Sequence, residues 1–364
     1  MRRLWGIVLV AACYAPHASP GSPCAENGGC PVGLVCSPSS ATCELSAIDA
    51  PTSSPGDDAG LDATTDGPRD AFVQLVDGCV PTTEICGDGI DQDCNGSDPA
   101  CPPNDLATGA IDITMGGAFT ADITSAHADD PPHGCGASGG RDAFYKVQLA
   151  APTVFYFDTF GSDFDTVIRV YPGATCSATT GMATCSDDVC ATTRSQLATT
   201  LPAGPSCVVI AQASSTETGG AIMFRVINTN HTGIALPPFV GGTTSTMSST
   251  CGASEHTFGT CTTADPGPSV DAYFLTCPGN HTADISDCDA TWDSVAYVRP
   301  ARFAMEIDCN DDGTDYTPAK CGVNSGTASF IAGATLDGAG LWWAGIGGYT
   351  SMDCGPFTLT VTLP

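Results

Sequence analysis

The residues of this chain most suited to chemistry are oxygen-bearing side chains at alternate positions of one short segment. Asp91, Asp93 and Asn95 are spaced two apart, and Gly96 follows them. Three such side chains, with a glycine that permits a sharp turn, are typical of the opening of a calcium loop. Pro102 stands where an EF-hand loop would have its closing glutamate, so a complete EF-hand is excluded. We therefore predict a calcium site of another kind, with ligands drawn from Asp88, Asp91, Asp93, Asn95 and Asp98.

Cysteines surround this acidic turn. Residues 79–103 contain four of them, which could form two disulfides in place of a hydrophobic core: Cys79, Cys86, Cys94 and Cys101. The sequence 84–98 resembles a metal-binding motif of secreted bacterial proteins, in which paired cysteines bracket an Asp-rich turn. Compared with that motif, this copy is one residue short between Gly96 and Asp98. The alternative is a disulfide-pinned acidic turn that holds no stable metal.

A second acidic segment is a weaker candidate for metal binding. Asp308, Asn310 and Asp312 repeat the spacing of two, and Gly313 follows them. Turns also favour Asp and Asn, because these side chains hydrogen-bond to the local backbone. An ordinary turn is therefore the alternative.

Trp342 and Trp343 are the candidate ligand-binding residues. Adjacent residues of a strand point to opposite faces, so one indole faces away from the core if 341–346 is a regular strand. An outward indole could stack on a sugar ring or a peptide. Alternatively, it packs against the neighbouring domain or against the insertion at 313–326.

Signatures of catalysis are weak in this sequence. His127, Asp129, Asp130 and His133 form one local cluster, within a proline-containing loop. The His-Glu-x-x-His pattern of metalloproteases is absent, and nothing marks an apolar pocket that would raise one carboxyl pKa for acid catalysis. We expect that the protein is not an enzyme. The alternative is a secreted hydrolase, of peptidase or glycosidase type, with an unrecognised active site.

The N-terminus has the pattern of an export signal. Two arginines precede an apolar run at 4–12, and Cys13 follows. The sequence 10–13, Val-Ala-Ala-Cys, resembles a bacterial lipobox, in which the cysteine becomes the lipidated first residue. The chain has 21 cysteines, so lipidation of Cys13 leaves an even number for disulfides. We predict a signal peptide at 1–12 and an outer-membrane or cell-surface lipoprotein; an ordinary signal peptide and a freely secreted protein are the alternative.

The charge of the chain limits its partners. Acidic residues number 40 against 11 basic ones, for a formal net charge of -29. Nucleic acid is a poor partner, because neutralising its phosphates needs clustered Lys and Arg. Calcium is a better one, since carboxylate oxygens are its natural ligands. We expect an extracellular polysaccharide or protein as the partner, and contact with the membrane only through the lipid anchor.

Small modules precede the larger domains. After a lipidated tether at 13–23, residues 24–43 form a knot that needs disulfides because it has too little apolar area for a core; its cysteines are Cys24, Cys30, Cys36 and Cys43. Residues 44–78 contain many Asp, Pro, Thr and Ala and no cysteine, so we predict a disordered acidic linker. The metal-binding motif at 79–103 follows.

From residue 104 onward the pattern is typical of β-structure. Short β-branched and aromatic runs are separated by Gly, Pro, Asp and Ser, and no long helical pattern occurs; the runs are 110–114, 119–124, 143–149, 154–158, 167–171, 207–211 and 222–227. The sequence therefore predicts an all-β protein. We expect two tandem jelly-roll-like sandwiches, at 104–230 and 231–364.

An internal repeat supports two similar domains. Four short sequences recur in the same order, at 135–138 and 251–254, 142–145 and 271–274, 164–167 and 292–295, and 185–188 and 309–312. The first copy has five cysteines and the second has seven. Since both counts are odd, either one disulfide crosses between the copies or Cys251 pairs backwards in the chain.

These repeated residues also carry a family resemblance. The order Asp-Ala-Phe-Tyr at 142–145, Phe-Asp-Thr-Val at 164–167 and Cys-Ser-Asp-Asp at 185–188 resembles the bacterial pre-peptidase C-terminal domain. The resemblance covers about 104–227 well and 232–364 more loosely. It implies calcium-stabilised or ligand-binding sandwiches that accompany secreted enzymes or surface proteins. We therefore expect a non-enzymatic surface lipoprotein with calcium-dependent binding or adhesion modules, with a purely structural envelope role as a further alternative.

Overall fold

The computed structural model describes two strands near the N-terminus and most of the chain from residue 80 onward. The described residues are 34–37, 42–45 and 80–364, except 131–134, 137–138, 175, 177–183, 217–218, 238–240, 258, 263–264, 303–304 and 316–318. The predicted signal peptide, Cys13 and the linker beyond Leu45 therefore lie outside the described residues, whereas the first two residues of the predicted linker, 44–45, belong to a strand. The chain divides into two units, 1–73 and 74–364. In the first unit, β1 (Leu34–Ser37) pairs antiparallel with β2 (Thr42–Leu45).

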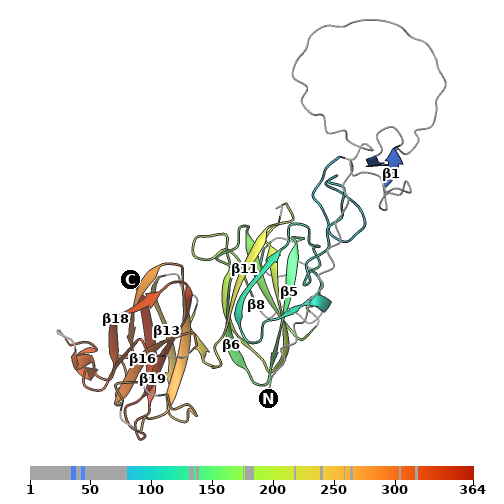
Figure 1. The fold of residues 1–364 in the computed structure, drawn as a ribbon. Helices are drawn as coiled ribbons and strands as arrows, with labels where there is room; N and C mark the ends of the chain where they lie inside the picture. The colour runs from blue at the N-terminus through green and yellow to red at the C-terminus, as the bar shows by residue number, and fades with distance from the viewer. Residues whose placement is uncertain are drawn as a thin grey trace, which may run out of the picture. The chain divides into compact units, whose positions relative to one another are not determined.

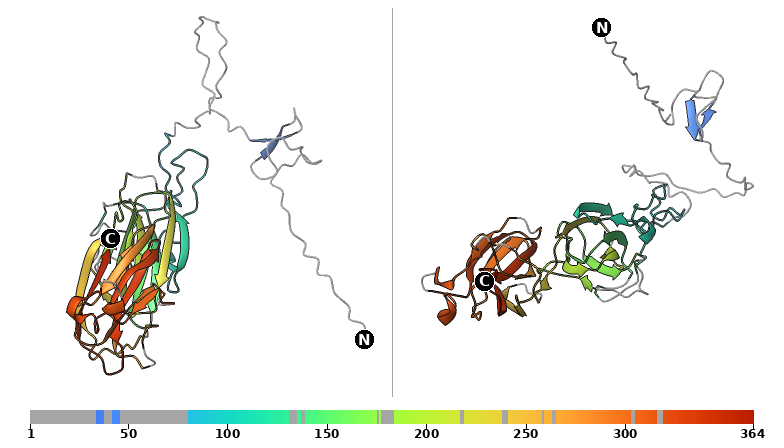
Figure 2. Two further views of the ribbon diagram at one scale, coloured as in Figure 1. Left: turned by 90° about the vertical axis from the view of Figure 1, so that its left-hand side faces the viewer. Right: turned by 90° about the horizontal axis from the view of Figure 1, so that it is seen from below.

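The first β-sandwich of the second unit consists of two sheets that enclose a hydrophobic core (Figures 1 and 2). One sheet has the strand order β3 (Ile111–Asp112), β5 (Asp142–Leu149), β10 (Gly204–Gln212), β7 (Thr166–Pro172), β8 (Thr184–Ser186). The other has the order β4 (Gly117–Asp122), β11 (Ala221–Asn228), β6 (Thr153–Asp158), β9 (Gln196–Leu201). A short 3-10 helix, η2 (Ala107–Gly109), precedes β3.

The second β-sandwich has the same construction. One sheet has the order β12 (Ile234–Ala235), β14 (Ser269–Thr276), β19 (Gly340–Gly348), β16 (Ser294–Pro300), β17 (Asp308–Asn310). The other has the order β13 (Gly242–Ser249), β20 (Pro356–Leu363), β15 (Asn280–Ser286), β18 (Phe330–Asp337). Two 3-10 helices, η4 (Gly313–Asp315) and η5 (Gly322–Asn324), lie in the insertion between β17 and β18.

The two sandwiches repeat each other strand for strand. In both, the first strand pairs parallel with its neighbour (β3 with β5, β12 with β14), and the other strand pairs of the two sandwiches are antiparallel. The predicted all-β class with two jelly-roll-like sandwiches is confirmed. The seven runs predicted in the first copy coincide with β3, β4, β5, β6, β7, β10 and β11.

Burial explains why these sequences form these strands. In β11 alternate residues are buried, because one face lies on the core and the other faces solvent. In β10, by contrast, seven consecutive residues are buried. Val208 and Ile210 contribute to the core between the sheets, whereas Cys207 and Val209 belong to a second apolar cluster that includes Ala110. A central strand covered on both faces accounts for the unbroken apolar sequence at 207–211.

Disulfides staple both sandwiches and join them to each other. The first contains Cys135–Cys185 and Cys176–Cys207, and the second contains Cys251–Cys354, Cys261–Cys309 and Cys288–Cys321. Cys190 of the first sandwich is bonded to Cys277 of the second. Of the two alternatives left by the odd cysteine counts, the structure therefore has a disulfide that crosses between the copies. So many disulfides are typical of proteins in an oxidising, extracytoplasmic environment.

Candidate metal centre

Three carboxylates converge beside the acidic turn. One oxygen each from Glu84, Asp91 and Asp93 lies within 4.8 Å of the others. Glu84 is only 8% exposed, and its Oε2 accepts a hydrogen bond of 2.9 Å from the Asp93 N–H. Its buried Oε1 has no hydrogen-bond partner among the described residues. A buried carboxylate oxygen without a donor is unfavourable unless a cation lies beside it.

The turn orients Asp91 and Asp93 through backbone hydrogen bonds. The two carboxylate oxygens of Asp91 accept from the N–H groups of Asn95 (3.0 Å) and Gly96 (2.7 Å). Asp93 also accepts from the Asn95 N–H at 3.0 Å, and the Asn95 amide oxygen accepts from the Ser97 N–H at 3.0 Å. Gly96 has a φ of 95°, which side-chain-bearing residues rarely adopt, so glycine is required for this bend.

The remaining predicted ligands serve the neighbouring turn. Asp98 accepts from the N–H groups of Gly87 and Gly89, both at 2.6 Å. Asp88 accepts from the Gln92 side-chain amide at 2.6 Å. Neither aspartate belongs to the convergent group of three carboxylates. Their role in the structure is to hold the backbone that leads into the turn.

The acidic turn is attached to the first sandwich. The disulfide Cys86–Cys101 closes the segment, and Cys94 is also disulfide-bonded. The Cys86 N–H donates to the Ser125 carbonyl at 2.8 Å, and Arg141 Nη2 donates to the Glu84 carbonyl at 2.8 Å. These contacts tie the backbone of Glu84 to the sandwich. A metal bound here would therefore stabilise the junction as well as the turn.

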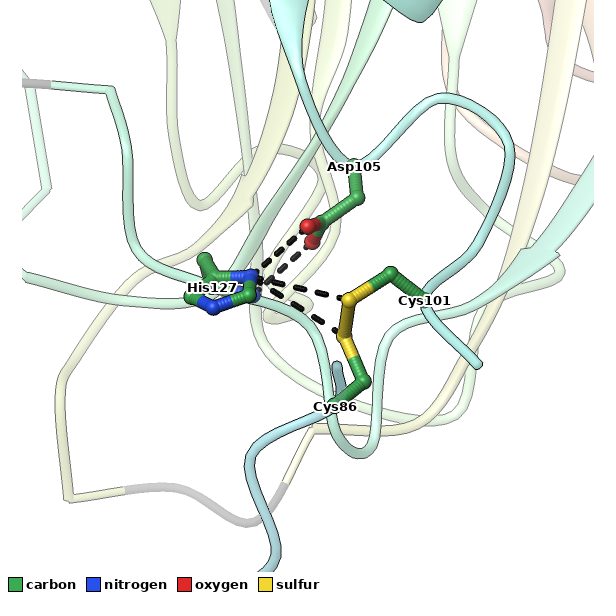
Figure 3. Close-up of side chains that lie close together, drawn as sticks. All are labelled: Cys86, Cys101, Asp105 and His127. Atoms are coloured by element: carbon green, nitrogen blue, oxygen red, sulfur yellow. Dashed lines mark hydrogen bonds and ion pairs between the residues drawn. A yellow bond between two sulfur atoms is a disulfide. The ribbon is translucent and has the colours of Figure 1, made fainter. Parts of the chain in front are cut away.

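A nearby group of residues of the types that often bind metals has a structural role instead. Figure 3 shows that one ring nitrogen of His127 faces both Asp105 and the Cys86–Cys101 disulfide. His127 Nδ1 lies 2.7 Å from Asp105 Oδ2, and 3.9 Å and 3.8 Å from the two sulfur atoms. Because the sulfurs are bonded to each other, neither is available as a thiolate ligand. The hydrogen bond that Asp105 Oδ2 accepts from His127 raises the pKa of His127, which favours an ion pair at this position.

The local His/Asp cluster noted in the sequence is likewise divided among structural contacts. Asp130 is buried and accepts from Arg169 Nη1 at 2.9 Å and from the Tyr171 hydroxyl at 2.8 Å. His133 lies outside the described residues. A buried carboxylate paired with both a guanidinium and a phenol is part of the sandwich interior rather than a reactive site.

Each sandwich also has an acidic cluster at the same place in the repeat. In the first, carboxylate oxygens of Asp165, Asp187 and Asp188 lie within 4.8 Å of one another. In the second, the pKa of Asp293 is raised to about 6 by burial and then by the charges of Asp353 and neighbouring aspartates. The carboxylates of such a cluster repel one another unless a cation lies between them.

The second calcium-like sequence lies at a strand end. Asp308 and Asn310 are the first and last residues of β17. The Asn310 amide donates to Asp315 Oδ2 at 2.7 Å and accepts from the Phe330 N–H at 3.2 Å. Burial raises the pKa of Asp312, with a further contribution from neighbouring aspartates. The contact with Asp315, five positions along the chain, is hydrogen bonding of the kind that the turn alternative expects.

The prediction of a tryptophan platform is wrong. Trp342 is 8% exposed and Trp343 is 0% exposed. The Trp342 indole N–H donates to Thr276 Oγ1 at 2.8 Å, and that of Trp343 donates to the Ala301 carbonyl at 3.0 Å. The two side chains do point to opposite faces, but both faces of β19 are covered. Trp343 packs in an apolar cluster with residues of the first sandwich, including Tyr156, as the alternative foresaw.

Comparisons with known proteins add little to this geometry. No protein-family model matches the chain, and no curated protein matches it. A solved structure of the CUB1-EGF-CUB2 domain of human MASP-1/3 is 7% identical, with 69% of this chain and 100% of that chain covered and a TM-score of 0.17. A triple jelly-roll protein of an archaeal virus is 9% identical, with coverages of 68% and 58% and a TM-score of 0.19. Tripeptidyl peptidase 2 is 10% identical, with coverages of 70% and 24% and a TM-score of 0.17. Similarities this low carry no argument about function.

The fold and the site together define a disulfide-stapled tandem β-sandwich protein with an oxygen-rich candidate metal centre. None of the described residues belongs to a helix long and apolar enough to cross a membrane. Of the three convergent carboxylates, sequence reasoning named Asp91 and Asp93 but missed Glu84. Glu84 does open the motif at 84–98, yet only the folded turn shows that it returns to within reach of Asp91.

Proposed function

We propose that this protein is a non-enzymatic cell-surface lipoprotein whose calcium-stabilised modules bind an extracellular polysaccharide or protein. Support for the surface location comes from the many disulfides and from the lipobox-like sequence that ends at Cys13. Support for the binding role comes from the tandem sandwiches, which agree in class with the pre-peptidase C-terminal resemblance. On this proposal the acidic linker at 44–78 extends the folded modules away from the membrane.

The observation that carries the calcium proposal is the convergence at Glu84, Asp91 and Asp93. All three ligand atoms are carboxylate oxygens, which suit a hard cation such as calcium. Zinc also takes nitrogen and sulfur ligands, and none is present in this group. A cation between them offsets their mutual repulsion and gives the buried Glu84 Oε1 a partner. Extracellular calcium modules bind with dissociation constants of roughly 10⁻⁴–10⁻³ M, so the site suits calcium concentrations outside the cell.

Thermal unfolding of the full oxidised chain tests the calcium site. At 10 mM calcium, a site of this affinity stabilises the folded state by about 1–3 kcal/mol relative to the same protein in chelator. Asp91→Asn and Glu84→Gln should remove that increment. Asp98→Asn is the matched control, because it weakens the backbone at Gly87 and Gly89 without changing the three convergent carboxylates. It should lower stability equally with and without calcium.

The result is decisive in either direction. An unchanged melting temperature on adding calcium to the unsubstituted chain supports the alternative of an acidic turn without metal. If calcium still raises the stability of both the Asp91→Asn and the Glu84→Gln variant, the calcium site lies elsewhere. The clusters at Asp165 and Asp293 are then the next positions to substitute.

The binding role is tested separately. The full chain should be retained by polysaccharides or proteins isolated from the surface of its own cells in calcium, and released by chelator. Assays of the same full chain with ester, glycoside and peptide reporter substrates test the enzyme alternative. Turnover that one substitution abolishes would replace the binding proposal with a hydrolase.

A further inference from the structure

A cleft of about 400 Å³ lies where strands of the two sandwiches meet. It is lined by β8 and β9 from the first sandwich and by β12 and β14 from the second, together with residues next to these strands. This volume falls in the range of small-molecule binding sites, about 300–1,000 Å³. Neither the acidic turn nor the acidic clusters contribute a residue to it.

The walls of the cleft are mostly apolar and carry no charged side chain among the described residues. Val189, Leu197, Leu236, Phe274 and Leu275 are among the lining residues, and none of the described residues of the lining is Asp, Glu, Lys, Arg or His. In a chain of net charge -29, a site without a cation disfavours anions. The cleft thus suits an uncharged apolar molecule.

One buried polar side chain gives the cleft a specific contact. Gln196 lines it and is 7% exposed. Its Nε2 donates to the Tyr156 hydroxyl at 3.0 Å and to the Thr276 carbonyl at 2.8 Å. Among the described residues its Oε1 contacts Cys190 Sγ at 3.8 Å, and that sulfur has no proton to donate because it is bonded to Cys277. A buried amide oxygen at the wall of a cleft is therefore left to accept a hydrogen bond from a ligand.

The cleft is held open by contacts that cross between the sandwiches. The disulfide Cys190–Cys277 lies in its wall, and the bond from Gln196 to Thr276 joins β9 to β14. Trp343 and Tyr156 pack in the apolar cluster shared by the two sandwiches. A site whose walls are connected in this way is preformed, which lowers the entropic penalty of binding.

We propose that this cleft binds a small, uncharged, apolar molecule that donates one hydrogen bond to Gln196 Oε1. The proposal is independent of calcium and of the surface ligand. It adds a second binding site to the molecule, formed only when the two sandwiches are joined.

N-phenyl-1-naphthylamine is a suitable probe, because it is uncharged, consists of two aromatic groups and has one N–H donor. Its fluorescence should be titrated with the full oxidised chain bearing Cys13→Ser, so that no acyl chain can take up the probe. We expect saturable binding. The N-methylated probe, which has no donor, should bind roughly three- to tenfold more weakly. The sulfonated probe 8-anilinonaphthalene-1-sulfonate should bind at least tenfold more weakly, since its charge has no partner in the cleft.

Ala235→Trp tests the location. Ala235 lines the cleft and is exposed on β12, so an indole there fills the cleft without disturbing the core. The substitution should abolish saturable binding. Ala118→Trp, at an exposed position of β4 outside the cleft, is the control and should leave binding unchanged. Equal binding by the Ala235→Trp variant, equal affinity for the sulfonated probe, or no saturable binding would each overturn the proposal.

Discussion

At the scale of single residues, Asp142 should make stability depend on pH. This carboxyl group is fully buried, and burial raises its pKa to about 8; hydrogen bonds from the Asp130 and Asp129 N–H groups oppose the rise. Between pH 4 and pH 7 the unfolded chain has released this proton and the folded chain retains it. Raising the pH through this window therefore destabilises the fold, by up to about 1.4 kcal/mol per pH unit for one group.

Asp142→Asn removes the titration without changing the shape of the side chain. The free energy of unfolding of the variant, relative to wild type, should grow by about 1–3 kcal/mol between pH 4 and pH 7. Denaturant titrations across this range measure it, with Asp337→Asn at the exposed end of β18 as the reference substitution. A difference between Asp142→Asn and wild type that stays constant with pH would show that the carboxylate is charged in the folded state.

Single residues also show where sequence reasoning succeeds and where it stops. Spacing predicted Asp91 and Asp93, because the turn that brings them together is local. Spacing did not identify Glu84, because only the folded turn shows that it returns to within reach of Asp91 and Asp93. Nor could it identify Arg141, whose contact with Glu84 spans 57 positions of the chain. Asp88 and Asp98 fit the pattern equally well as ligands or as turn acceptors, and only the geometry separates the two roles.

At the scale of elements, the strands were predictable where burial has a clear period. The runs at 143–149 and 222–227 became β5 and β11 because their apolar residues match one or both covered faces. β8 and β9 were missed: β8 is three residues long, and β9 contains three threonine or alanine residues at its centre. Edge strands of this kind are ordered by their neighbours, so their own sequence carries little signal.

Gly345 on β19 should be essential to the second sandwich. It lies in register between Asp271 on β14 and Tyr297 on β16. The Tyr297 ring lies over Gly345, and its hydroxyl donates a hydrogen bond to Asp271 Oδ1 at 2.6 Å. An added Cβ would lie 2.1 Å from the ring. Gly345→Ala should therefore destabilise the protein by about 1–3 kcal/mol, as other overpacked cores do.

Equilibrium denaturation with disulfides intact measures this effect. Gly340→Ala on the same strand is the control, because its added Cβ would meet no atom closer than 3.8 Å. If the two variants are equally stable, Tyr297 does not pack across β19 in solution.

At the scale of the whole molecule, the sequence predicted two sandwiches but not how they are joined. Order and spacing of the repeated sequences were sufficient for the first conclusion, since each copy folds around its own core. The odd cysteine counts left open whether a disulfide crosses between the copies or Cys251 pairs backwards. Disulfide partners and the burial of Trp343 depend on proximity between residues far apart in the chain, such as Cys190 and Cys277, which are 87 positions apart.

The crossing disulfide should make the sandwiches unfold as one unit. Cys190 and Cys277 close a long loop, and removing such a bridge costs about 2–4 kcal/mol. With Cys190→Ser and Cys277→Ser together, the restraint between the sandwiches is reduced to the peptide linker and the shared apolar cluster. Calorimetry of the double variant should then resolve two transitions where wild type shows one. Cys135→Ser with Cys185→Ser is the control, because that bridge lies within the first sandwich. Its loss should lower the transition temperature but leave a single transition. A single transition in the Cys190/Cys277 variant would mean that the apolar cluster around Trp343 is sufficient to couple the sandwiches.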